Sequence, residues 1–334
     1  MTKKVFYSKK IDNISKLKTS FILDNKNLLK NQKRINSFYT KQKKRKKCKN
    51  CNFLLSESYF NSHNVKYTLC SKCNHLNGHH EESISFANFL YNNELGVNYI
   101  KSYSKNYNSR VRNIYLPKID FIRSVIKKKI NIIDIGSGAG QFLKACEIRK
   151  IQATGYELNK KLVGYAREKL RRNVINNIKL DQVNNIIEDN EGSNLLSLIN
   201  VLEHVNDPNS ILKSFVNSNL EFIFISVPLF SLSCFIENSF KEVYPRLLAG
   251  AHTHLYTKES LYFLFKKHKL KVIGEWWFGE DFLDLFRSLL VSSNSQKKKY
   301  DRYLKKYLFS TLNELQSVLD KKKICSEVHI ILSK

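Results

Sequence analysis

The sequence lacks any apolar run that approaches the roughly 18–20 residues needed to cross a bilayer. Its first ten residues carry four lysines and no apolar segment of the kind that directs secretion. These two absences predict a cytoplasmic protein without a transmembrane segment. In that compartment we expect the seven cysteines to bind metal or to remain free thiols, because disulfides are rare there.

Acidic residues are scarce, with 29 Asp and Glu against 57 Lys and Arg, and the net charge is +28. Residues 1–50 hold seventeen Lys and Arg against two Asp, and the densest run spans residues 41–47. Such a run could contact nucleic acid or, peripherally, an anionic membrane surface. It could equally be a solvated, partly disordered arm. Few aromatic residues lie among these charges, which counts against stacking on bases.

Glycine is also scarce, with 11 residues, and three of them fall within five positions at Gly136, Gly138 and Gly140. They follow a β-branched run at 130–135 that predicts a buried strand. A segment compatible with a helix comes next. Strand, glycine turn and helix bring backbone N–H groups and a helix N-terminus close to a ligand. Glu157 ends the next apolar segment, about twenty residues on, where an acidic side chain binds ribose hydroxyls.

The segment Asp134-Ile-Gly-Ser-Gly-Ala-Gly resembles motif I of the class I S-adenosylmethionine-dependent methyltransferases. Segments 195–208, 222–228 and 252–261 resemble later parts of that family in the same order. The resemblance covers roughly residues 115–334. It implies an α/β fold with a Rossmann-like, seven-stranded sheet, a methyltransferase activity and S-adenosylmethionine as the cofactor. The glycine spacing disfavours a dehydrogenase.

By this resemblance, the cofactor is bound by the glycine loop, by the end of the second strand and by the segment after the fourth strand. The residues implied are Asp134, Gly136, Ser137, Gly138, Gly140, Glu157, Leu158, Asn200, Val201 and Leu202. Three histidines are candidates for a general base, because histidine titrates near neutral pH. They are His204, His252 and His254.

Strands and helices alternate through the second half of the chain, which predicts a mostly parallel sheet. Strands are expected near 130–135, 151–156, 177–181, 195–200, 222–227, 270–277 and 325–333, the last one antiparallel. Helices are expected at 160–172, 257–268, 281–291 and 298–319, with Thr257 as the N-cap of the second.

Two Cys-x-x-Cys pairs are separated by eighteen residues, and they comprise Cys48, Cys51, Cys70 and Cys73. This spacing predicts a zinc ribbon in which four thiolates hold one structural Zn²⁺. A hairpin between 53–55 and 66–69 would bring the pairs together. Four protein ligands leave no position for water, so the metal is expected to fold the module and not to catalyse.

These features divide the chain into four parts. We expect a basic arm at 1–45, a zinc ribbon at 46–80 and a helical lid or linker at 81–128. The methyltransferase domain would occupy 129–334, with an inserted cap at 228–251.

A zinc ribbon ahead of such a domain resembles bacterial methyltransferases of sugar and surface-polysaccharide pathways. That resemblance implies a small sugar-type acceptor, most simply a nucleotide-linked sugar. Where the sugar C-methyltransferases carry Tyr-His-Glu-His, this chain reads Ala251-His252-Thr253-His254, which favours O-methylation. The Asn/Asp-Pro-Pro-Tyr/Phe turn of enzymes that methylate adenine or glutamine is absent. The basic run and the ribbon leave RNA or ribosomal protein as an alternative acceptor, and a cofactor-binding subunit without activity as a third hypothesis.

Overall fold

The computed structural model describes residues 2–11, 24–90, 104, 106–171, 174–248, 252–292 and 298–334. In these residues the main sheet has eight strands in the order β1-β11-β12-β9-β8-β5-β6-β7. Their bounds are β1 Lys4–Tyr7, β5 Asn131–Ile135, β6 Gln152–Glu157, β7 Ile175–Asn177, β8 Leu195–Ile199, β9 Phe222–Pro228, β11 Lys271–Phe278 and β12 Glu327–Ser333. All pairs are parallel except those of β12. The predicted Rossmann-like α/β fold is confirmed.

The eighth strand, β1, was not expected, because residues 1–45 read as a basic arm. It pairs in parallel with the edge strand β11, with Lys4 opposite Gly274. All four of its side chains are exposed, so it lacks the alternation of polar and apolar residues by which a strand is recognised. The third predicted strand also differs: β7 covers 175–177, and a short 3-10 helix, η3 Leu180–Gln182, follows it.

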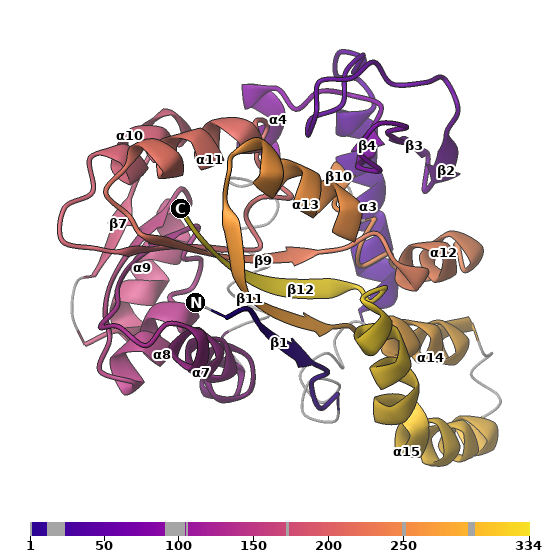
Figure 1. Ribbon diagram of the computed structural model, residues 1–334. Helices are drawn as coiled ribbons and strands as arrows, with labels where there is room; N and C mark the ends of the chain where they lie inside the picture. The colour runs from indigo at the N-terminus through magenta and orange to yellow at the C-terminus, as the bar shows by residue number, and fades with distance from the viewer. Residues whose placement is uncertain are drawn as a thin grey trace.

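Helices cover both faces of the sheet (Figure 1). One face carries α7 Leu116–Val125, α8 Gln141–Ile148 and α9 Lys160–Lys169, and the other carries α10 Val183–Glu188, α11 Pro208–Asn217 and α13 Lys258–Lys267. In β5 the buried side chains alternate between the layers, with Ile132 facing one and Ile133 and Ile135 the other. Thr257 caps α13 as expected, and its side chain accepts a bond from the Ser260 N–H.

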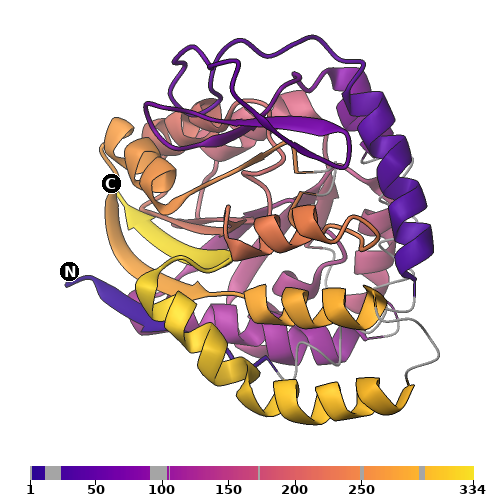
Figure 2. The same ribbon diagram turned by 90° about the vertical axis from the view of Figure 1, so that its right-hand side faces the viewer.

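A smaller sheet contains the cysteine-rich segment. Its order is β10-β4-β3-β2, with β2 Phe60–Ser62, β3 Val65–Leu69, β4 Leu76–Gly78 and β10 His254–Leu255. The predicted hairpin between 53–55 and 66–69 is wrong, because β3 pairs with β2 and β4. Helix α3 Asn25–Tyr39 runs along one side of the molecule below this segment (Figure 2). Because β10 comes from the C-terminal half, the cysteine-rich segment and the methyltransferase-like region share one sheet.

The predicted lid and cap contain short helices. Residues 81–128 include α4 Ile84–Asn88, α6 Tyr107–Arg110, the π-helix η2 Val111–Tyr115 and α7, while 91–103 and 105 lie outside the described residues. The cap contains α12 Leu232–Ser239, and 249–251 lie outside the described residues. Helices α14 Asp281–Ser292 and α15 Lys298–Lys322 precede β12. Within the described ranges, no helix is long and apolar enough to span a membrane.

Candidate active site

A cavity of about 650 Å³ opens at the carboxyl ends of β5, β6 and β8. The chain leaves β5 toward β6 on one side, whereas β8 and β9 continue the sheet on the other. Such a reversal of strand order leaves a crevice outside the strand ends, where ligands bind in open α/β sheets. The topology alone therefore locates the candidate site.

The glycine loop forms one wall of this cavity. Gly136 has φ +75°, and a Cβ placed there would lie 2.7 Å from Val201 Cγ2. Both facts require glycine, because other residues are strained in this conformation and a side chain would collide with the β8 loop. Gly140 has φ +73° and is the residue before α8. A Cβ at Gly140 would lie 3.0 Å from Ala166 Cβ, so this glycine lets the start of α8 pack closely against α9.

Two buried carboxylates flank the loop. Glu157, at the end of β6, accepts bonds of 2.8 Å from the N–H groups of Gly138 and Asn159. Asp134, in β5, accepts a hydrogen bond from the Ser197 hydroxyl. Burial raises the pKa of Asp134 to about 7, although the hydroxyls of Ser197 and Ser137 oppose the shift. Burial also raises the pKa of Glu157.

Eight of the ten residues that sequence reasoning assigned to the cofactor line the cavity. They are Asp134, Gly136, Ser137, Gly138, Glu157, Leu158, Asn200 and Val201. Gly140 and Leu202 do not line it. Leu202 is fully buried in the core between the sheet and α11, and Gly140 accepts a bond from the Tyr107 hydroxyl. Asn200 has φ +54°, a conformation that asparagine tolerates better than most residues.

His204 and His252 lie together at the other end of the cavity, and their ring centroids are 4.9 Å apart. His252 Nδ1 lies 2.8 Å from the Leu247 carbonyl oxygen. Since a carbonyl only accepts, Nδ1 carries the proton and Nε2 keeps a lone pair. Burial lowers the pKa of His252 to about 4, so the ring is neutral at neutral pH. Its role as a base remains a prediction.

The third candidate, His254, is not among the residues that line the cavity. It is fully buried in β10, and its Nδ1 lies 2.9 Å from His75 Nε2. Burial holds the pKa of His254 well below its usual value. The predicted role of His254 as a base does not fit this position, because an acceptor in the cavity would not reach its ring.

Glu203 lies beside the histidine pair and is fully buried. Its Oε1 is 3.9 Å from His204 Nε2. Burial raises the pKa of Glu203 to about 8, and its own backbone and the nearby Asn200 amide oppose this shift only in part. From the sequence, Glu203 is a candidate to anchor one of the histidines, and it is not among the predicted site residues.

Sequence reasoning also missed Lys118, which lines the same end of the cavity from α7. Its Nζ lies 2.9 Å from His329 Nε2, 3.2 Å from Ser226 Oγ and 3.8 Å from a Glu327 carboxylate oxygen. Burial lowers the pKa of Lys118 to about 7, while Glu327 opposes the shift. These residues come from a helix and two strands far apart in the sequence, and no local motif marks them.

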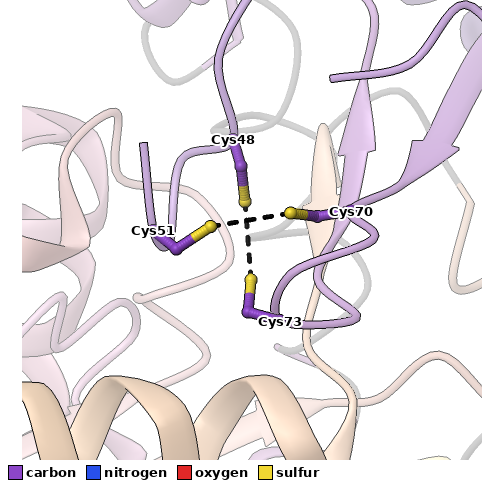
Figure 3. Close-up of side chains that lie close together, drawn as sticks. All are labelled: Cys48, Cys51, Cys70 and Cys73. Carbon is purple, nitrogen blue, oxygen red and sulfur yellow. Dashed lines mark hydrogen bonds between the residues drawn. The ribbon is translucent and has the colours of Figure 1, made fainter. Parts of the chain in front are cut away.

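The four predicted zinc ligands converge (Figure 3). The sulfurs of Cys48 and Cys73 are 3.7 Å apart, those of Cys51 and Cys70 are 3.5 Å apart, and all four lie within 4.8 Å of one another. A tetrahedral ion bound at about 2.3 Å would set its sulfur ligands about 3.8 Å apart. This geometry fits Zn²⁺. His75, His79 and His80 are not part of the cluster.

Side-chain amides support the cysteine cluster. Asn77 donates to Cys48 Sγ at 3.5 Å, and Asn50 donates to Cys73 Sγ at 3.6 Å. Such bonds orient metal ligands and stabilise thiolates. The cluster therefore could bind a zinc ion.

Comparison with known families now identifies the class of protein. A family model described as a methyltransferase domain matches residues 107–275, just over half of the chain. The chain belongs to this family. With the fold described above, it is an S-adenosylmethionine-dependent methyltransferase of class I. No curated protein matches the chain.

Several solved structures are similar to the chain. An S-adenosylmethionine-dependent methyltransferase from Archaeoglobus fulgidus is 17% identical, with 70% of this chain and all of the other covered and a TM-score of 0.43. The magnesium protoporphyrin IX methyltransferase of Synechocystis is 8% identical over 75% of this chain and all of its own, with a TM-score of 0.47. Phosphoethanolamine N-methyltransferase 2 of Haemonchus contortus is 12% identical over 78% of this chain and 62% of its own, with a TM-score of 0.48.

Proposed function

We propose that the protein transfers the methyl group of S-adenosylmethionine to a hydroxyl oxygen of a nucleotide-linked sugar or a related polysaccharide precursor. The observation that supports this acceptor is a basic groove beside the methyl-transfer cavity. The groove has a volume of about 420 Å³ and is lined mainly by the basic run and its neighbours. Its lining residues are Lys43, Lys44, Arg45, Lys46, Lys47, Cys48, Lys49, Asn52, Glu81, Asn206, Asp207 and Asn209.

The groove and the cavity are neighbours, because Asn206 and Asp207 line both. Arg45 and Lys49 are engaged in the groove wall, where they pair with the Glu82 carboxylate at 2.7 and 2.9 Å. The exposed lysines 44, 46 and 47 remain as positive charges facing solvent. A diphosphate in the groove would place the sugar of a nucleotide sugar toward the cavity.

The reaction needs little from the protein beyond position. The acceptor oxygen forms a bond to the methyl carbon as the carbon–sulfur bond breaks, and S-adenosylhomocysteine leaves without the sulfonium charge. The hydroxyl proton must leave as well. His204, His252 and Lys118 are among the polar groups that line the acceptor end where this happens.

A test combines substrates with a charge-matched pair of variants. Wild-type protein and the variant Lys44→Ala/Lys46→Ala/Lys47→Ala receive labelled S-adenosylmethionine and a panel of nucleotide sugars. We expect turnover on at least one sugar and a KM about tenfold higher in the variant, because phosphate contacts are lost. The control, Lys127→Ala/Lys128→Ala/Lys129→Ala, removes three exposed lysines that do not line the groove, and its KM should not change. No turnover on any sugar together with turnover on bulk RNA would overturn the proposal.

RNA is the second candidate acceptor, because the same groove presents consecutive lysines that could follow a phosphate backbone. Deleting residues 1–47 would not test it cleanly, since β1 belongs to the main sheet and α3 packs on the small one. The three-lysine variant tests it instead. If RNA is the acceptor, the affinity for RNA falls as the salt concentration rises, and it falls less steeply in the three-lysine variant. The small molecule is favoured because lid and cap residues, among them Tyr115 and Arg246, line the cavity that adjoins the groove.

We also propose that the cysteine cluster holds a structural Zn²⁺. The support is the fit of the sulfur distances to a tetrahedral ion and the amide bonds to two of the sulfurs. Four thiolates leave no open position on the metal, so its contribution is to the fold.

A further inference from the structure

We propose that the acceptor end of the cavity contains a second metal site, in which Glu203, His204 and His252 bind one divalent transition-metal ion. One ligand atom from each of these residues lies within 4.8 Å of the other two. Within the described part of the chain, this is the one such group besides the four cysteines. The proposal rests on the proposed function only for the role of the ion, and not for its binding.

Glu203 lacks the hydrogen bonds from described residues that a buried carboxyl usually accepts. Its side chain is fully buried, and neither carboxylate oxygen accepts a hydrogen bond of normal geometry from a described residue. A buried carboxyl without such hydrogen bonds either keeps its proton or pairs with a cation or a metal ion. The contrast with Glu157 is direct, because both oxygens of that buried carboxylate accept backbone N–H groups.

The ring of His252 is held in an orientation that suits a metal ligand. Its Nδ1 donates to the Leu247 carbonyl oxygen at 2.8 Å, and this bond holds the ring in one tautomer. Histidines that bind metals are held by the same kind of bond on the nitrogen away from the metal. The lone pair on Nε2 is then available for an ion in the cavity, which His252 lines.

The three side chains offer a set of donor atoms that matches transition metals. Two imidazoles and one carboxylate suit Mn²⁺, Fe²⁺, Co²⁺ or Zn²⁺. Bonds of about 2.1 Å would draw the three donor atoms to roughly 3–3.5 Å from one another, a contraction of about 1 Å. Small changes in side-chain torsions can supply it. Three protein ligands leave positions open on the ion.

The open positions would face the cavity, because His204 and His252 both line it. An acceptor hydroxyl bound there would ionise more readily, since a divalent cation stabilises the alkoxide. Its proton passes to solvent, the oxygen takes the methyl carbon, and the carbon–sulfur bond breaks. In this arrangement the two histidines are ligands, and they do not serve as the base that the sequence predicted.

Manganese is the appropriate probe, because thiolate sites bind hard cations poorly. Full-length protein with zinc in its cysteine cluster is titrated with Mn²⁺, and free Mn²⁺ is followed by electron paramagnetic resonance. We expect one Mn²⁺ per chain. Glu203→Gln and His252→Ala should each weaken this binding at least tenfold. Glu259→Gln and His268→Ala are the controls, because neither residue lines the cavity, and both should bind Mn²⁺ as wild type does.

Calorimetry with S-adenosylmethionine on every variant shows whether the cofactor end is folded and separates the two proposals. No Mn²⁺ binding by the wild type, or equal binding by Glu203→Gln that still binds the cofactor, would overturn the metal site. Normal Mn²⁺ binding without transfer to any nucleotide sugar would overturn the proposed acceptor and leave the metal site in place. Methyl transfer to a sugar that is unaffected by chelation and by Glu203→Gln would support the proposed acceptor and overturn the role of the metal ion.

Discussion

The two ends of the cavity differ in how their charged groups are satisfied. At the cofactor end, Glu157 accepts hydrogen bonds from two backbone N–H groups, and Asp134 accepts one from the Ser197 hydroxyl. At the acceptor end, the equally buried Glu203 accepts no hydrogen bond of normal geometry from the described residues. The cofactor end therefore satisfies its buried carboxyls with hydrogen bonds from the chain itself, whereas Glu203 at the acceptor end lacks such bonds from the described residues.

Removing zinc should give the largest effect, because it should lower methyl transfer much more than the affinity for S-adenosylmethionine. In the variant Cys70→Ser/Cys73→Ser we expect methyl transfer to fall at least about 100-fold, because the proposed Zn²⁺ would hold the module against β10 and the adjacent His252. The affinity for S-adenosylmethionine should change less than about threefold, since no cysteine of the cluster lines the cofactor end. Zinc content, turnover and calorimetry measure these effects.

The matched control for the zinc variant is Cys325→Ala, which removes a buried free thiol outside the cluster. It should keep its zinc and most of its activity. An equal loss of cofactor binding and turnover in the zinc variant would mean that the two ends do not fold independently.

Gly136→Ala should instead weaken cofactor binding and leave the acceptor end unchanged. The new Cβ would meet Val201 Cγ2 at 2.7 Å and would strain a residue at φ +75°. The backbone strain alone costs about 1–2 kcal/mol, and the collision displaces the loop. We expect S-adenosylmethionine to bind at least about tenfold more weakly, while Mn²⁺ binding is retained.

Gly192→Ala controls for the backbone strain. This glycine has φ +78°, but a Cβ there would meet nothing within 4 Å. The control should lose stability and keep its affinity for the cofactor. Wild-type affinity in Gly136→Ala would contradict the contact with Val201 as the reason for glycine.

Asp134 makes the stability of the cofactor end depend on pH, because burial raises its pKa to about 7 from a usual value of 3.8. Between pH 4 and 7 the folded chain keeps a proton that the unfolded chain has lost. Raising the pH through this window therefore lowers the stability of the folded state, and above pH 7 the penalty stays constant. Asp134→Asn should gain stability relative to wild type from pH 4 to 7, by up to a few kcal/mol.

Urea unfolding without cofactor, repeated from pH 4 to 8, measures this difference. Asp181→Asn, which changes an exposed carboxyl, serves as the control. Its difference in unfolding free energy from wild type should stay nearly constant over this pH range. A stability difference between Asp134→Asn and wild type that stays flat across the range would show that the carboxyl is solvated or paired.

The cofactor end was largely predictable because its determinants are local in sequence. A strand, a glycine turn and an acidic residue at the next strand end follow one another between Asp134 and Glu157, and each constrains the backbone directly. The cysteine cluster was predictable for the same reason, since each Cys-x-x-Cys pair forms one turn. The expectation of a mostly parallel sheet came from the alternation of predicted strands and helices.

The acceptor end could not be predicted in this way. His252 and His254 are two residues apart and looked equivalent, but pairing of β10 with β4 buries His254 against His75, 179 positions away. Lys118 meets Ser226 and His329 across 108 and 211 positions. Contacts over such separations leave no periodic or spacing signal in one sequence.

Because β10 belongs to the cysteine-rich sheet, residues 46–80 cannot be exchanged between enzymes as an independent module. The Lys49 ammonium donates to the Val205 carbonyl oxygen at 2.8 Å, and the Asn50 amide donates to the Ser260 carbonyl oxygen at 2.9 Å. A cassette cut at residues 46–80 would sever these bonds and the pairing of His254–Leu255. A recombined enzyme can therefore exchange this module only if the segment around residues 252–260 travels with it.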